Sequence, residues 1–370
     1  MVCYITACSR IDPQSRGDSN RMSISSTPKP LTVSKRKSPW VNIALMGVSI
    51  GLLGVVIFLN RVQLREVLSR PIDPNRFGLA FLFLLTALIC TFTRWFSLAR
   101  ALDLPVTWFD AIKLGFIGNL WNLIIPGAVG GDAIKGVYVC RGQARSRKTH
   151  AIASIVLDRI LGLLGLFLLA AVTGLSAWSK TGTDVHRLVI LAWIAVICGM
   201  TGLTVVFTPA LYRPLNRMVA EKKKLAKILA ELESMASAYR DRIWVVAAAL
   251  LGSMGIHALL VTSFYIVGTA LFPTIPSLSE HFVIVPLVLF TTAVPLPFGA
   301  LGVSEEASAK LFELVGHPGG AIAMMGFRIV MYAGGALSAL VYLANMREVK
   351  SLQNEKNQLP ADPVPNASTY

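Results

Sequence analysis

The chain has 370 residues, of which 54% are hydrophobic and 15% are charged, and its mean hydropathy is +0.61. Soluble domains average about 25% charged residues, so this composition excludes a single soluble domain and indicates a membrane protein. The formal net charge of +15 would suit a nucleic-acid partner only if the basic residues formed one polar patch.

The basic residues lie instead beside apolar segments, before residue 40 and in two later loops. They are Lys35, Arg36, Lys37, Arg141, Arg145, Arg147, Lys148, Arg213, Arg217, Lys222, Lys223, Lys224 and Lys227. Basic residues at span ends face the cytoplasm and attract anionic lipid head groups. We therefore expect no nucleic-acid partner, and a multi-pass protein of the cell (cytoplasmic or inner) membrane with both termini in the cytoplasm. One group is an exception, because this topology places it outside: Arg61, Arg65, Arg70 and Arg76.

Six apolar segments approach or exceed the roughly 20 helical residues that cross a hydrocarbon core. They are Trp40–Leu59, Phe77–Phe96, Ile160–Trp178, Leu188–Phe207, Ile243–Phe272 and Ile322–Ala344. The sequence thus predicts an all-α, polytopic integral membrane domain over residues 40–345. Residues 1–39 are rich in Ser, Pro and basic side chains, which is typical of a disordered tail. We expect residues 346–370 to form a polar C-terminal tail.

Two shorter apolar segments, Ala111–Ile125 and Phe282–Val294, run into sequences rich in Pro and Gly. Each is predicted to enter the membrane, break and return to the same side as a re-entrant helical hairpin. Between residues 219 and 242, apolar residues recur at three- and four-residue steps opposite a face of Lys and Glu. This pattern is typical of an amphipathic helix, lying either on the cytoplasmic membrane surface or on the protein's own loops.

The first break is the stretch IIPGAVGGDAIKG, whose helix-breaking residues are Pro126, Gly127, Gly130 and Gly131. Proline lacks a backbone donor, and glycine permits positive φ or close backbone approach. Asp132 is expected to cap a helix that restarts at Ala133. Such irregular backbone is tolerated at membrane depth where protein buries it or where it lines a wet cavity.

The second break, PLPFGALGVSEE, repeats these features with Pro297, Gly299 and Gly302, a capping Ser304 and the acid Glu305. Each break precedes a long apolar helix that contains one arginine, Arg159 after the first and Arg328 after the second. Three predicted spans separate the breaks, so the two hairpins open on opposite sides and form an inverted repeat. Discontinuous inverted repeats are typical of transporter-type binding sites near the membrane midplane.

Charged residues inside spans are unfavourable unless they serve a site or a partner. The candidate lipid- or substrate-binding residues therefore include both acids and both arginines, with Asn119 and Asn122 lining the same cavity. Asp158 is a further candidate, but it shares its helix face with small residues suited to close packing. A structural interhelical ion pair is its competing interpretation. An ordinary capped cytoplasmic loop is the alternative for either break taken alone.

Other polar residues receive simpler interpretations. Arg94, near a predicted span end, is expected to snorkel to the interface, and His257 is expected to be an interhelical hydrogen-bond partner. The five cysteines contain no CxxC pair, which favours neither disulfides nor zinc. Because the sequence contains no P-loop, HExxH or GxSxG motif, we expect no cofactor, no metal and no catalytic residue.

The stretches NLWNLIIPGAVGGDAIKG and SIVLDRILGLLGL, with PLPFGALGVSEEASAKLFELVG and GFRIV later, resemble the transmembrane region of lysylphosphatidylglycerol synthases. The resemblance covers the chain from about Trp40 to Ala344. Lys135 stands where an arginine is expected, so a compact ammonium group replaces a planar guanidinium with several hydrogen-bond donors. That region is the flippase part of those bifunctional proteins and also occurs alone. No soluble aminoacyl-transferase domain follows the last span, so we expect the stand-alone form, without lysyl transfer.

This resemblance implies a flippase or lipid-handling protein for a phosphate-bearing lipid. The N-termini of the helices that restart at Ala133 and Glu305 would face the phosphate. Arg159 and Arg328 would add charge-assisted hydrogen bonds. Asp132 and Glu305 would hold an amine or sugar, or restrain the arginines. Two alternatives stay open. One is a membrane-embedded enzyme with either acid as general base. The other is a non-catalytic partner of a separate synthase or glycosyltransferase.

Overall fold

The computed structural model describes residues 65, 69, 73–124, 130–140, 145–178, 182–212, 214, 223–293, 300 and 302–345. The predicted span Trp40–Leu59, both tails and four predicted site residues lie outside them: Pro126, Gly127, Pro297 and Gly299. Over the described residues the chain forms helices and no strand. The all-α prediction is therefore confirmed for this part of the chain.

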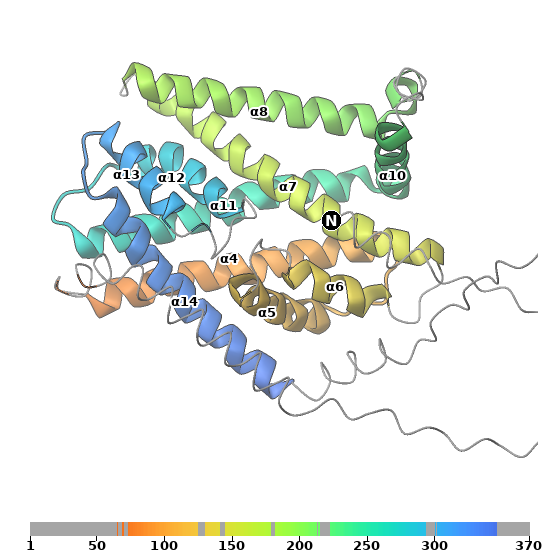
Figure 1. Cartoon of the computed structure of the whole chain (residues 1–370), viewed down its shortest axis with the longest axis horizontal. Helices are drawn as coiled ribbons and strands as arrows, with labels where there is room; N and C mark the ends of the chain where they lie inside the picture. Colours follow the sequence, from red (N-terminus) through yellow and green to blue (C-terminus); the bar gives the residue numbers. More distant parts are fainter. Residues whose placement is uncertain are drawn as a thin grey trace, which may run out of the picture. The chain divides into compact units, whose positions relative to one another are not determined.

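Five long apolar helices contain the five predicted spans that fall within these residues (Figure 1). They are α4 (Pro74–Ala101), α7 (Arg145–Ala177), α8 (Thr183–Phe207), α11 (Ile243–Leu271) and α14 (Gly320–Ala344). Each contains an apolar stretch long enough to cross a membrane. The chain is thus a multi-pass α-helical membrane protein.

Four shorter helices occupy the regions of the two predicted hairpins. They are α5 (Trp108–Ile124), α6 (Gly130–Cys140), α12 (Leu278–Ala293) and α13 (Val303–Glu313). Helix α5 packs against α6, and α12 packs against α13. Two backbone glycines make the first contact close, because a Cβ on Gly131 would lie 2.6 Å from the carbonyl oxygen of Gly118.

The predicted helix restarts at Ala133 and Glu305 are wrong by two or three residues. Helix α6 begins at Gly130, and its Gly131 amide donates to the side-chain oxygen of Asn122 at 2.8 Å. Asp132 therefore lies inside the first turn and not before it. In the second hairpin α13 begins at Val303, where Gly302, with φ of 81°, donates its amide to Glu305 at 2.7 Å.

The N-termini of α5 and α12 carry the same reciprocal cap, which repeats between the two halves. Before α5, the Thr107 amide donates to Asp110 at 3.2 Å, and the Asp110 amide donates to the Thr107 hydroxyl at 3.2 Å. Before α12, the Ser277 amide donates to Glu280 at 2.6 Å, and the Glu280 amide donates to the Ser277 hydroxyl at 3.3 Å. Each pair is a capping box.

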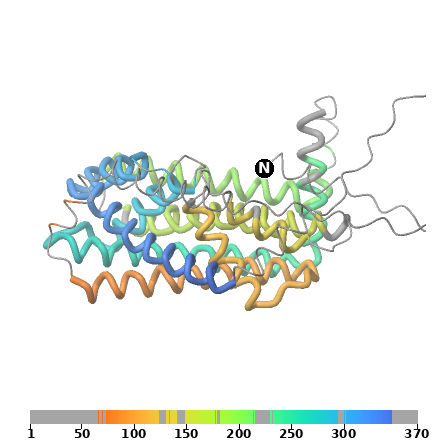
Figure 2. The backbone as a smooth tube through the Cα atoms, turned by 60° about the horizontal axis from the view of Figure 1, so that its bottom comes forward, coloured from red at the N-terminus to blue at the C-terminus, as the bar shows by residue number. Residues whose placement is uncertain are grey.

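The two halves also pack reciprocally. Helix α5 contacts α14, where Asn119 donates to the Ser338 hydroxyl at 3.0 Å, and α12 contacts α7, where the Thr173 hydroxyl donates to the Phe282 carbonyl at 3.0 Å. Between these pairs, α4 and α11 lie side by side in opposite directions (Figure 2). Each short hairpin is therefore held by the long helix that follows the other hairpin.

The amphipathic pattern between residues 219 and 242 corresponds to α10 (Lys223–Tyr239) and the short 3-10 helix η2 (Arg240–Arg242). Helix α10 packs on α7 and α8, and its buried Tyr239 hydroxyl donates to the Leu98 carbonyl at 3.0 Å. Tyr239 joins Trp95 in one apolar core, while Phe264 and Phe327 centre a second core among α11, α12, α13 and α14.

Candidate functional site

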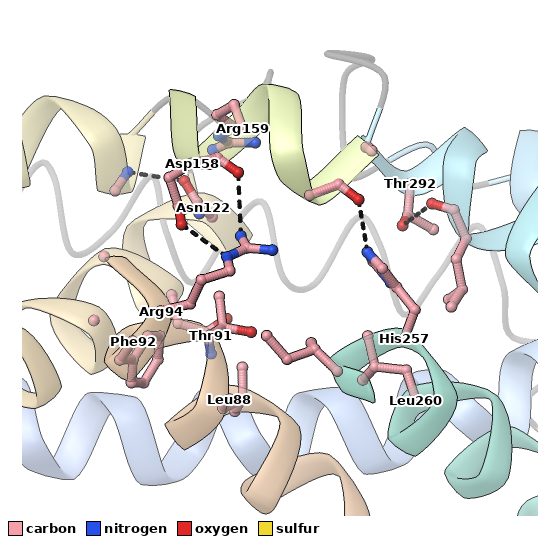
Figure 3. Close-up of a pocket in the computed structure, with 18 of the residues that line it drawn as sticks. Leu88, Thr91, Phe92, Arg94, Asn122, Asp158, Arg159, His257, Leu260 and Thr292 are labelled. Carbon is pink, nitrogen blue, oxygen red and sulfur yellow. Dashed lines mark hydrogen bonds and ion pairs between the residues drawn. The ribbon is translucent and has the colours of Figure 1, made fainter. Parts of the chain in front are cut away.

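A cavity of about 330 Å³ opens between the first hairpin and helices α4, α7, α11, α12 and α14 (Figure 3). Six predicted site residues line it: Asn119, Asn122, Gly131, Asp132, Asp158 and Arg159. Three titratable residues that were not predicted as site residues join them: Arg94, Lys135 and His257. Leucines from α4, α7 and α11 form part of the apolar lining: Leu84, Leu88, Leu163, Leu166 and Leu260. The wall is therefore charged in one part and apolar in another.

Asp132 and Arg159 form an ion pair between α6 and α7, with Arg159 Nε 2.7 Å from Asp132 Oδ2. The side chains remain 23% and 37% exposed, and both residues line the cavity. The acid and arginine predicted to act at the first break are thus joined. An ion pair that keeps this exposure can exchange its partner for a ligand without an isolated charge being buried.

Arg94 does not snorkel to the interface, and that prediction is wrong. Its side chain is 8% exposed and points from α4 toward α7, where Nε donates to Asp158 Oδ1 at 2.9 Å (Figure 3). A second nitrogen donates to the Ser253 hydroxyl at 2.6 Å and a third to the Asp158 carbonyl at 3.2 Å. Asp158 therefore makes the interhelical ion pair that was its competing interpretation.

Two glycines that follow Asp158 on α7 let the neighbouring helices approach. A Cβ on Gly162 would lie 3.3 Å from the Arg94 guanidinium, and one on Gly165 would lie 2.4 Å from the Ser253 Cβ. The Gly162 carbonyl accepts a hydrogen bond from His257 Nε2 at 2.9 Å (Figure 3). The prediction that His257 is an interhelical hydrogen-bond partner is confirmed.

The second break forms a buried cluster whose charged residues do not line the cavity, although the neighbouring Phe327 does. Arg328 is 4% exposed; its Nε donates to Glu305 Oε1, and one terminal nitrogen donates to the Ser304 hydroxyl. Glu305 also accepts the Gly302 amide. The two halves thus repeat the same acid–arginine pair, but only the first pair faces the cavity. Gly130, Gly302, Glu305 and Arg328 are not among the residues that line it.

Arg94 and Lys135 are the charged residues that sequence reasoning missed. Arg94 follows an apolar run in α4 and precedes Trp95 and Phe96, so its helix continues well past the predicted span end. The apolar residues on both sides were the signal that it lies inside the helix. Lys135 was noted only as a departure from an expected arginine. Its place one turn after Asp132 on α6 indicates that both face the same way.

The donor set does not favour a metal ion. Both acids that line the cavity, Asp132 and Asp158, are engaged by arginines. Within the described ranges, no group of three or more His, Cys, Asp or Glu residues is placed to hold a metal. What the arrangement offers is paired charges, neutral amide and hydroxyl groups and an apolar wall.

The fold and this site define a multi-pass α-helical membrane protein with a charged internal cavity. The family model of the lysylphosphatidylglycerol synthase TM region matches residues 43–339. The chain therefore belongs to that family, as its sequence motifs indicated.

One curated relative is the UPF0104 membrane protein PH1989 of Pyrococcus horikoshii, 26% identical over 87 residues. The match covers 23% of this chain and 26% of that relative, about a quarter of its length. No solved structure matches the chain.

Proposed function

We propose that this protein moves a phosphate-bearing lipid between the leaflets of its membrane, with the cavity as the head-group site. The observation that carries the proposal is the cavity lining. Charged side chains inside a membrane domain are unfavourable unless they serve a site or a partner. Here five of them line one hollow together with leucines of three long helices. A lipid has the same division between a charged head and apolar chains.

The repeated architecture supports a two-sided mechanism. In inverted-repeat transporters, alternating access arises when one repeat moves against the other around a fixed site. Here the first acid–arginine pair is partly exposed in the cavity, whereas the equivalent pair of the second half is buried. In the proposed cycle the halves exchange these roles, so that the head group is accessible from one side and then from the other.

The test uses the purified full-length chain in phosphatidylcholine vesicles that contain a trace of a fluorescent phospholipid. An impermeant quencher measures how fast the labelled lipid crosses the bilayer. We expect the protein to accelerate crossing, and Arg159→Ala to slow it by about tenfold or more, because a charge-assisted hydrogen bond contributes about 1.5–3 kcal/mol. Arg187→Ala is the matched control. Arg187 also forms an ion pair, with Asp184 at 3.0 Å, but the Arg187 side chain is 80% exposed.

Crossing rates equal to those of protein-free vesicles, for every phospholipid tested, would overturn the proposal. Activity that appears only after a separate synthase or glycosyltransferase is added would then favour the accessory role. Conversion of the labelled lipid into a new chemical species would favour a membrane-embedded enzyme. Mass spectrometry of the recovered lipid distinguishes these two outcomes.

A further inference from the structure

A second cavity, of about 240 Å³, lies between α7, α8 and α10 and shares no lining residue with the charged one. Its wall consists of glycine, alanine, aliphatic side chains, one methionine, one phenylalanine and Tyr239. The Tyr239 hydroxyl already donates to the Leu98 carbonyl at 3.0 Å. A polar ligand would therefore find no side-chain partner among the described residues of this wall, and an apolar cavity does not retain water. Its occupant must be apolar.

Small residues keep this space open, and part of its wall lies at the surface. A Cβ on Gly202 of α8 would meet no atom within 4 Å. Gly202 and Ile160 both line the cavity and are exposed. Helices α7 and α8 each contain an apolar stretch long enough to cross a membrane. The medium outside the opening is therefore the hydrocarbon of the bilayer, which consists of acyl chains.

Basic residues lie next to the end of the cavity where α10 meets the end of α8 (Figure 1). Phe207 lines the cavity, and its carbonyl accepts from Arg240 Nε at 3.2 Å. The carboxylate of Glu233 is 3.7 Å from a terminal nitrogen of Arg240, which is too far for a hydrogen bond. Basic residues beside a span attract lipid phosphates. Three more basic residues belong to the first five positions of α10: Lys223, Lys224 and Lys227.

We propose that this cavity binds one acyl chain of a membrane phospholipid, with the lipid phosphate beside Arg240. The volume of about 240 Å³ is below the roughly 300–1,000 Å³ of pockets that enclose a whole drug-sized ligand, so it suits one chain. Leu157 and Ile160 line this cavity, whereas Asp158 and Arg159 between them line the charged one. The bound chain therefore supports, from behind, the turn of α7 that presents both charged residues.

The experiment uses the purified full-length chain in neutral detergent, with a phospholipid that carries a photoreactive diazirine on one acyl chain. After illumination, mass spectrometry of the peptides locates the adducts. We expect adducts on Leu203, Val206 and Met235 in preference to Ile190 and Ile194, which are exposed on α8 outside the cavity. Adducts distributed according to exposure alone would overturn the site, because lipid that merely surrounds the protein labels in that way.

A variant that fills the cavity gives the second test. Gly202→Leu should reduce labelling of the cavity residues at least about tenfold, the change in affinity expected when two methylene groups lose their burial. Gly252→Leu is the matched control, since Gly252 is an exposed glycine of α11 that lines neither cavity and whose Cβ would meet no atom within 4 Å. Undiminished cavity labelling in a folded Gly202→Leu variant overturns the inference.

Competition on the unmodified chain covers the case in which the variant does not fold. Unlabelled phospholipid should suppress the cavity adducts to saturation. Diacylglycerol with the same chains should compete about tenfold more weakly, because it lacks the phosphate that accepts a charge-assisted hydrogen bond from Arg240. Absence of competition by phospholipid overturns the bound chain. Equal competition by diacylglycerol or by free fatty acid overturns the phospholipid as the occupant.

Discussion

Arg94 and Arg328 show what a buried guanidinium does in this protein. Each lies inside a long helix, is less than a tenth exposed and donates both to a carboxylate and to a serine hydroxyl on a neighbouring helix. Arg159 differs because its side chain is 37% exposed and lines the cavity. The three arginines therefore divide into two that join helices and one that is accessible to a ligand.

For Arg94 we predict a loss of stability on truncation. Arg94→Ala leaves Asp158 buried without its partner, and breaking a buried pair in this way costs about 3–5 kcal/mol. Arg94→Ala combined with Asp158→Ala should recover part of the loss, since no charge remains unpaired. Thermal unfolding in detergent measures both. A single variant as stable as the unmodified chain would contradict the buried pair.

The equivalent arginines of the two halves should respond differently to Arg→Lys. Arg328→Lys replaces the guanidinium group that donates to both Glu305 and Ser304. We therefore expect the free energy of unfolding to fall by about 1–3 kcal/mol. Arg159→Lys, at a partly solvated site, should change stability by less and lipid crossing by more. Melting temperature and vesicle assays on both variants check this. Identical stability losses would mean that Arg159 is as structural as Arg328.

At the scale of helices, the first hairpin depends on the contact between Gly118 and Gly131. No side chain separates α5 from α6 at this point, because a Cβ on Gly131 would lie 2.6 to 2.8 Å from backbone atoms of Gly118. The hairpin presents Asn122, Asp132 and Lys135 to the cavity. The glycine contact therefore determines where the polar wall of the site stands.

Gly131→Ala should separate α5 from α6, because backbone atoms cannot rotate away as a side chain can. Overpacking of this kind typically costs about 1–3 kcal/mol, and lipid crossing should fall with it. Gly136→Ala is the control on the same helix, since its Cβ would meet only Ile155 at 3.8 Å. There we expect unchanged or slightly higher stability, because alanine is the better helix former. Equal melting temperatures for the two variants would contradict the close contact.

At the scale of the whole bundle, two sets of helices repeat one arrangement. The capping boxes before α5 and α12, the acid–arginine pairs, and the contacts of α5 with α14 and α12 with α7 all recur. The exposure of the two acid–arginine pairs does not recur. In an inverted-repeat protein that alternates between two states, the two equivalent sites are expected to differ in exposure within either state.

Topology gives the test of inversion. In a cysteine-free background, Thr107→Cys and Ser277→Cys mark the equivalent starts of α5 and α12, and both positions are exposed. An impermeant thiol reagent applied to intact cells should label Ser277→Cys, whereas Thr107→Cys should react only after permeabilisation. Labelling of both from one side would contradict an inverted repeat, whatever the lipid transported.

Local sequence determined the helices themselves. The length of each apolar run set five long helices, and the sequence placed the four short helices on either side of the two Pro-Gly stretches. The pairing of charges was different. That Asp158 meets Arg94 and that Asp132 meets Arg159 depend on how α4, α6 and α7 pack. A buried charge demands a compensating group, but any donor or acceptor brought within about 4 Å by the fold can supply it. Only the tertiary structure decides which one does.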